Sequence, residues 1–237
     1  MIYALLPCEY NGEKAMKKLI CISASNTKLI GNNSTSVKVG YLIENITHNQ
    51  VKDKITVQVL SLMDYDLKTC ILCGCCNSNS RCVYDEEFNH LLTLIEEADG
   101  IVFIVPHYSP IPAKLIMLFE KLNEIMYSGW LKNSEYKASW CNIPAVVIAH
   151  GGMVETQESL SYYYDQLVTR VAETLRSLTF QIIGANDEYP NGVCFGLRDD
   201  NCLKTREGAI FPDILQDWEM IEERVEPLIS RLLSIMS

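Results

Sequence analysis

The sequence lacks the features of several large classes of protein. Its longest apolar runs, IVFIVP and AVVIA, are far shorter than the roughly 20 residues that a membrane-spanning helix needs. Basic residues are in the minority, because 20 Lys and Arg stand against 30 Asp and Glu and give a net charge of −10. Such an acidic surface repels phosphate backbones and anionic lipids. We therefore expect no nucleic acid and no membrane as a partner, and small soluble molecules are favoured.

Signals for export and for nucleotide binding are also missing. In the opening stretch MIYALLPCEYNGEKAMKK the charges follow the apolar part, which is the reverse of a secretory signal. We therefore expect a cytoplasmic protein in a reducing compartment, where structural disulfides are disfavoured. Neither G-x-G-x-x-G nor G-K-[ST] occurs, so the sequence has no dinucleotide fingerprint and no nucleoside triphosphate loop.

Continuous apolar runs alternate with amphipathic segments along most of the chain. Runs of this kind are typical of parallel strands that are covered on both faces, and they predict strands over 18–25, 56–63, 101–109, 144–152 and 180–187. Helical spacing and capping residues predict helices over 34–46, 85–98, 113–126, 158–179 and 217–236. The last of these helices is expected to be interrupted at Pro227. Five strands that alternate with helices predict an α/β fold, a doubly wound five-stranded parallel sheet with helices on both faces.

The chain is expected to form a single domain over residues 16–237. Its 237 residues, 48% of them hydrophobic, are enough to bury one α/β core. MKKLICIS, from Met16, is a typical start for such a fold, so residues 1–15 are expected to be an N-terminal extension. Its apolar piece MIYALLP is expected to pack on the sheet edge or on a neighbouring subunit. A cysteine-rich insertion occupies residues 66–84.

Polar loops follow three of the predicted strands, where doubly wound sheets bind their ligands. The loop 23–36 is rich in hydroxyl and amide groups and leads into a helix N-terminus, which can hold a phosphate. An ordinary capped surface loop is the alternative. The loop 105–109 offers an imidazole and a phenol, and the glycines of 150–153 let a flat ligand approach the backbone. Alternatively, this histidine is simply solvated and the tyrosine an aromatic at the core edge.

Five of the ten cysteines lie in CILCGCCNSNSRC, residues 70–82. Cys70, Cys73, Cys76 and Cys82 have the spacing C-x2-C-x2-C-x5-C, and two intervening residues let successive thiolates converge on neighbouring irons of a cluster. Structural zinc is an alternative, although four-cysteine zinc sites usually use two separated pairs. Unmetallated thiols are another. Cys75 could replace Cys76 as a ligand.

The other five cysteines are scattered. Cys8, Cys21 and Cys141 have apolar neighbours and are expected to be core thiols. Cys194 and Cys202 lie in the segment NGVCFGLRDDNC, after the last predicted strand. Their spacing fits no metal site, so we expect loop thiols there.

The order of these segments resembles the flavodoxin-like, NADPH-dependent FMN reductase superfamily, and within it the iron–sulfur flavoprotein branch. ISAS…GNNSTS, CILCGCC…C and EEADGIVFIVPHYSPIPAKLIMLFEK carry the resemblance, which runs from about Lys18 to Gly152. It implies FMN at the carboxyl ends of the strands and a 4Fe-4S cluster on the four spaced cysteines. The FMN phosphate would be held by Ser23, Ser25, Lys28, Asn33, Ser34 and Thr35. The isoalloxazine would be lined by Pro106, His107, Tyr108, Ser109, His150, Gly151 and Gly152.

Together these two cofactors would convert two-electron into one-electron chemistry. The resemblance implies an oxidoreductase that passes electrons between NAD(P)H or a redox partner, FMN and the cluster, with no side chain acting as nucleophile or base. One alternative is a cluster-free NAD(P)H-dependent FMN or quinone reductase, and another is a non-catalytic electron carrier. The resemblance also implies a homodimer or homotetramer in which the cluster of one chain faces the flavin of another. The sequence predicts neither the natural acceptor nor the preference for NADH or NADPH.

Overall fold

The computed structural model describes residues 16–77, 79–205, 207–208 and 213–237, so the predicted extension 1–15 lies outside the described residues. The central sheet has the order β2-β1-β3-β4-β5, with β6 also paired to β4, and all of these pairings are parallel. Its strands are β1 Lys17–Ser23, β2 Ile55–Ser61, β3 Gly100–Pro106, β4 Pro144–Val154, β5 Gln181–Ile182 and β6 Val193–Leu197. The doubly wound α/β fold expected from the sequence is confirmed.

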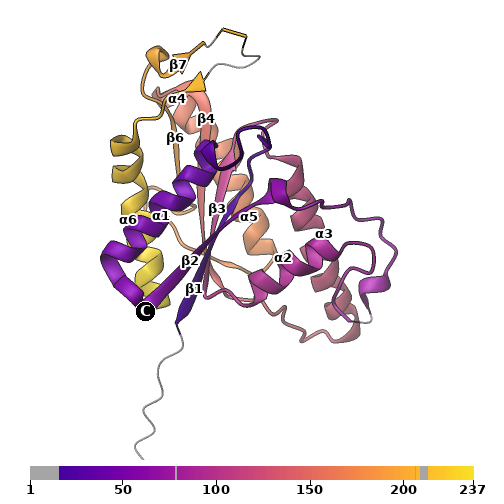
Figure 1. Ribbon diagram of the computed structural model, residues 1–237. Coiled ribbons are helices and arrows are strands. Elements are labelled where there is room, and N and C mark those ends of the chain that lie inside the picture. The colour runs from indigo at the N-terminus through magenta and orange to yellow at the C-terminus, as the bar shows by residue number, and fades with distance from the viewer. Residues whose placement is uncertain (1–15, 78, 206, 209–212) are drawn as a thin grey trace, which may run out of the picture.

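Helices cover both faces of this sheet (Figure 1). One face carries α1 Thr35–Val51 and α6 Trp218–Met236. The other carries α2 Glu86–Glu96, α3 Ala113–Lys132 and α5 Arg170–Ser177, and α4 Gln157–Tyr163 joins α5 through the π-helical turn Tyr164–Thr169. Alternate side chains of each strand enter opposite cores, so Ile20 packs with α2 and α3 while Cys21 packs with α1 and α6. Continuous apolar strands are therefore required.

The edge of the sheet beside β4 differs from the prediction. The strand expected over 180–187 is reduced to β5, after which the chain leaves the sheet and returns as β6. Gly192 allows this return, because its φ is +138° and a Cβ there would lie 2.1 Å from the carbonyl oxygen of Val147. Cys194, expected in a loop, is therefore buried in β6, and burial raises the pKa of its thiol to about 12.

Two further features were not predicted. Helix α6 runs through Pro227 without a break, because this proline lies on the exposed side, where water can reach the carbonyl that loses its partner. A short antiparallel ribbon, β7 Leu203–Lys204 with β8 Asp213–Ile214, stands above the carboxyl ends of the strands (Figure 1). Among the described residues, no helix is long and apolar enough to cross a membrane.

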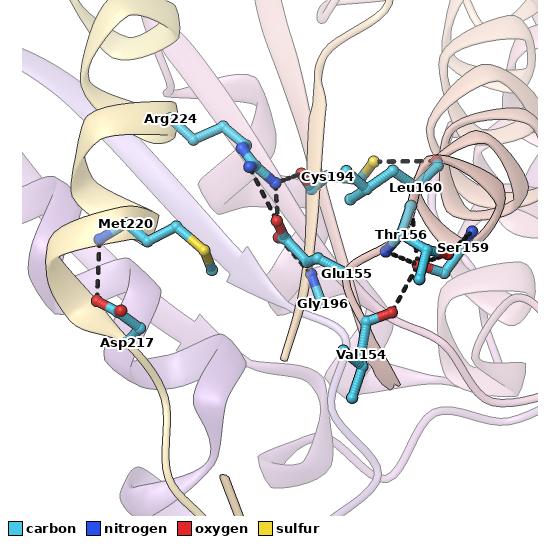
Figure 2. A network of polar contacts seen from close by, with 10 residues as sticks. All are labelled: Val154, Glu155, Thr156, Ser159, Leu160, Cys194, Gly196, Asp217, Met220 and Arg224. Carbon is cyan, nitrogen blue, oxygen red and sulfur yellow. Dashed lines mark hydrogen bonds and ion pairs between the residues drawn. The ribbon is translucent and has the colours of Figure 1, made fainter. Parts of the chain in front are cut away.

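Arg224 of α6 fixes the far end of β4 against β6 (Figure 2). Its guanidinium binds both carboxylate oxygens of Glu155, at 2.7 and 3.1 Å, and donates to the carbonyl oxygen of Cys194 at 2.9 Å. Glu155 in turn accepts the backbone N–H of Gly196 at 2.9 Å. This bidentate, largely buried pair holds the chain that follows the glycine turn of β4.

Candidate functional site

A cavity of about 460 Å³ lies at the carboxyl ends of β1, β3 and β4, where the fold predicts a ligand site. Of the residues predicted for cofactor binding, those that line it are Ser25, Asn33, Ser34, Thr35, Pro106, His107, Tyr108, His150, Gly151 and Gly152. Ser23 is instead fully buried beneath the loop, and Lys28 and Ser109 are exposed outside the cavity lining. Their proposed contacts with a ligand remain predictions.

Hydroxyl groups and the N-terminus of α1 form one end of this cavity. Ser34 caps the helix by accepting the N–H of Val37 at 3.4 Å, and the hydroxyls of Ser25 and Thr27 lie 2.6 Å apart. No lysine or arginine lines the cavity. An anion bound here would therefore be held by N–H and O–H groups and by the positive end of the helix dipole.

Tyr108 joins two of the loops. Its hydroxyl accepts the backbone N–H of Asn26 at 3.0 Å and lies 3.4 Å from the hydroxyl of Ser25. The side chain is 39% exposed. The phenol predicted to line a flavin ring thus also positions the loop predicted to hold the phosphate.

The end of β3 is tied to β4 and α4 through His107. Its N–H donates to the carbonyl oxygen of His150 at 2.7 Å, and its Nε2 lies 3.2 Å from the hydroxyl of Tyr162. Partial burial lowers the pKa of His107 below its usual value. The imidazole is therefore neutral at pH 7.

His150 links the end of β4 to the first turn of α1. Its Nε2 lies 2.8 Å from the hydroxyl of Ser36, and its ring stacks on Phe195 at 5.2 Å between centroids. Burial lowers the pKa of His150 from 6.5 to about 4. A neutral imidazole is therefore part of the wall of the cavity.

Acidification should weaken the fold through His150. The unfolded chain binds this proton at pH 6.5 but the folded chain only near pH 4, so the stabilisation is complete above 6.5 and is lost as the pH falls. Between these values the free energy of unfolding should fall by about 3 kcal/mol more in the wild-type apoprotein than in His150→Asn. Urea unfolding across this pH range measures the difference. Parallel pH profiles would contradict it.

The two glycines at the end of β4 have different surroundings. A Cβ on Gly151 would lie 2.0 Å from the hydroxyl oxygen of Tyr163, which accepts the N–H of Met153. A Cβ on Gly152 would meet no atom within 4 Å and would project into open space, and the backbone there has no positive φ. The cavity is thus open in front of Gly152, as a planar ligand would require.

Alanine at these two glycines should separate folding from binding. Gly152→Ala should leave the stability of the apoprotein within about 1 kcal/mol and weaken flavin binding at least about tenfold, because its methyl group would occupy ligand space. Gly151→Ala should instead destabilise the fold by about 1–3 kcal/mol, since Tyr163 must move. Unfolding curves and flavin titrations measure both effects. Undiminished flavin affinity in Gly152→Ala would exclude a ligand in front of this turn.

The cysteine-rich segment surrounds a second cavity, of about 310 Å³. Cys70, Cys73, Cys76 and Cys82 all line it, whereas Cys75 does not. The nine described cysteines form no disulfide with one another. Left-handed backbone at Leu72 (φ +51°) and Gly74 (φ +69°) turns the chain around this cavity.

The sulfur atoms are not arranged as in a metal site. In the part of the chain that the structure describes, no group of three or more His, Cys, Asp or Glu side chains could hold a metal ion. Cys76 Sγ instead lies 3.5 Å from the hydroxyl of Ser128 on α3. The donor set and the shared cavity suit a metal cluster, but the thiols would have to turn toward one another to bind it.

Both ends of the cysteine-rich segment are anchored. Asp85 caps α2, accepts the N–H of Lys68 at 2.8 Å and pairs with the buried ammonium group of Lys121. Asn89 exchanges two hydrogen bonds of 2.8 Å with the backbone of Cys82. The segment is therefore held at its base while its middle carries the thiols.

Sequence reasoning missed part of the first cavity. Thr27, Ile30 and Ser36 lie within or directly after the predicted phosphate loop and could have been inferred from their position. Residues 213–216 also line the cavity, although they follow β6 by more than a dozen residues. No motif marks them, and only the folded chain brings them to the site.

Comparison with known proteins agrees with this geometry. The family described as NADPH-dependent FMN reductase matches residues 18–172. An iron–sulfur flavoprotein of Methanocaldococcus jannaschii is 28% identical over 83 residues, which are 35% of this chain and 43% of that protein. The match thus spans less than half the length of that relative.

Solved structures share the fold at low sequence identity. A flavoenzyme NAD(P)H:acceptor oxidoreductase from Paracoccus denitrificans aligns with a TM-score of 0.55 at 13% identity, over 93% of this chain and 97% of its own. An FMN-dependent NADH-azoreductase from Bacillus anthracis, in complex with FMN, aligns with a TM-score of 0.52 at 16% identity, over 94% and 100%. Because the family match covers more than half of the chain, this protein belongs to the NADPH-dependent FMN reductase family.

Proposed function

We propose that this protein is an FMN-dependent oxidoreductase that takes electrons from NAD(P)H and passes them, through a 4Fe-4S cluster, to a small molecule or a redox protein. One observation carries the flavin part. Hydroxyls, a helix N-terminus and an open glycine turn surround a single cavity at the carboxyl edge of the sheet of an FMN reductase family member. These are the elements that a phosphorylated planar cofactor needs.

The chain's own residues would bind and orient FMN. Ser25, Ser34 and Thr35 would hold the phosphate without a basic side chain, and the open space before Gly152 would receive the ring. FMN, when bound, accepts two electrons from a nicotinamide and releases them singly or together. His107 and His150 stay neutral at pH 7, so neither places a positive charge beside the ring.

Four thiols around one cavity support the cluster part of the proposal. They have the spacing of an iron–sulfur motif, and the fifth thiol of the segment, on Cys75, does not line that cavity. The Methanocaldococcus relative is named an iron–sulfur flavoprotein. Cys76 is thereby favoured over Cys75 as the third ligand. A cluster-free FMN or quinone reductase, with zinc or nothing on the thiols, is the alternative.

The separation of the two cavities favours a homodimer or homotetramer. Helix α3 begins beside the flavin cavity, and Ser128, which contacts Cys76, lies 15 residues after Ala113, about 22 Å along the helix. A second copy would bring a flavin closer to the thiols. Exposed apolar side chains near the cysteine-rich segment suit such a contact: Ile71, Leu72, Val83, Tyr84, Tyr127, Trp130 and Leu131.

Removing two hydroxyls should test the flavin site. Ser25→Ala with Ser34→Ala should weaken FMN binding by an order of magnitude or more, because each hydrogen bond to a charged phosphate is worth about 1.5–3 kcal/mol. Riboflavin, which has no phosphate, serves as the control ligand and should lose less affinity. Fluorescence titration of the apoprotein measures both. Unchanged FMN affinity would count against the phosphate position.

Anaerobic reduction separates the proposal from its alternatives. The FMN-loaded protein should be bleached by NADH or NADPH and should turn over with a one-electron acceptor. A protein that accepts electrons only from another reduced protein would be a carrier. Turnover without iron in the anaerobically purified protein would identify the cluster-free reductase.

A further inference from the structure

Gln216 carries an unsatisfied acceptor at the flavin cavity. Its Nε2 donates to the hydroxyl of Thr35 at 3.3 Å, whereas its Oε1 is buried and accepts no hydrogen bond from the described residues. The side chain lines the same cavity as Ser25, Ser34 and Gly152. A buried carbonyl oxygen without a donor is unfavourable, and such an atom beside a ligand cavity points to a donor on the ligand.

The chain on both sides of Gln216 is fixed. The N–H of Leu215 donates to the carbonyl oxygen of Cys202 at 2.8 Å, next to the β7–β8 pairing. Asp217 caps α6 by accepting the N–H of Met220 and pairs with Arg198 at 2.6 Å. Gln216 therefore stands in a defined position over the first turn of α1, and it lies outside the part of the chain that the family match covers.

The chemistry of FMN restricts which of its groups can donate to Oε1. The phosphate is an acceptor at neutral pH and the dimethylbenzene edge has no polar hydrogen. The N3–H of the ring belongs to the end farthest from the phosphate. Because Thr35 begins the helix predicted to hold the phosphate, the nearest donors are the hydroxyls of the ribityl chain.

We propose that Gln216 binds the ribityl chain of FMN, its Oε1 accepting a hydrogen bond from a ribityl hydroxyl while its Nε2 stays on Thr35. This inference rests on the proposed FMN site. The reversed amide is the competing arrangement, because oxygen and nitrogen of an amide are assigned from their partners. In that case Thr35 would donate to Oε1 and Nε2 would face the phosphate.

Three flavins and two variants distinguish these arrangements. The apoprotein, Gln216→Leu and Gln216→Glu are titrated by flavin fluorescence with FMN, with riboflavin, which lacks the phosphate, and with lumiflavin, which lacks the ribityl chain as well. Gln216→Leu should weaken FMN and riboflavin by the same factor, about three- to tenfold, and leave lumiflavin unchanged. Gln216→Glu keeps an acceptor but adds a charge near the phosphate, so FMN should weaken and riboflavin should not.

Other outcomes overturn the inference. A loss in Gln216→Leu that is confined to FMN would assign the side chain to the phosphate, and unchanged affinity for FMN would remove it from the site. Equal weakening of all three flavins would make its role structural, which unfolding curves of the variant would check. If the wild-type apoprotein binds no FMN, the proposed function itself fails.

Discussion

Replacing Cys82 with serine is expected to remove iron from the anaerobically purified protein while FMN stays bound. Cys82 lines the thiol cavity, and its backbone is held by Asn89 through two hydrogen bonds of 2.8 Å, so the substitution changes a ligand atom rather than the course of the chain. A cluster with three thiolate ligands binds weakly at best. The variant should still be reduced by NAD(P)H but should pass electrons poorly to a one-electron acceptor.

Cys75→Ser is the matched control for this experiment. Cys75 belongs to the same segment but does not line the cavity, so this variant should keep its iron. Iron and flavin analysis of the two proteins, purified side by side, measures the difference. Full iron content in Cys82→Ser would refute the ligand assignment, and loss of iron in Cys75→Ser instead of Cys76→Ser would exchange the third ligand.

Replacing Lys121 with methionine is expected to destabilise the protein by about 3–5 kcal/mol, because it leaves a buried carboxylate without its partner. Lys121 and Asp85 are 3% and 2% exposed, and the ammonium group lies 5.2 Å from the ring centroid of Phe88. Asp85 also binds the N–H groups of Lys68 and Phe88. The pair therefore joins both ends of the cysteine-rich segment to α3.

The pH dependence of this loss identifies its cause. Burial alone would raise the pKa of Asp85, but hydrogen bonds from Lys121 and from the N–H groups of Lys68 and Phe88 hold it below the usual range. In the wild type this stabilisation is complete above about pH 4 and is lost as the pH falls through the folded pKa. The gap between wild type and variant should therefore narrow in acid.

A double variant is the control for the ion pair. Lys121→Met with Asp85→Asn should recover much of the stability, because no unpaired charge then remains buried. Urea unfolding of the wild type, the single variant and the double variant measures this. A double variant as unstable as Lys121→Met would show that packing of the lysine stem, and not its charge, is what matters.

The sequence predicted the sheet and its helices because their signals are local. Strands buried on both faces, such as β3, must be apolar throughout, and the capping residues Ser34 and Asp85 mark where their helices begin. The exchange of β5 for β6 depends on a contact between Gly192 and Val147, which are far apart in sequence. No local pattern reveals such a contact.

The candidate site was predictable to the same extent. Residues on loops that directly follow strands, such as Ser34 and Gly152, could be assigned because the fold alone brings the ends of β1, β3 and β4 together. Gln216 could not, since its place depends on how the chain returns after β6. The spacing of the cysteines predicted a cluster, and the structure adds that four of them share one cavity and Cys75 does not.

One measurement tests the central proposal most directly: the optical spectrum of the full chain purified without oxygen, together with its content of flavin, iron, acid-labile sulfide and zinc. The proposal predicts bound FMN and, for each flavin, about four iron and four sulfide, with broad cluster absorption beneath the flavin bands. Stoichiometric zinc without iron would contradict the cluster. Failure of the apoprotein to take up FMN would contradict the proposed flavin site and the function that rests on it.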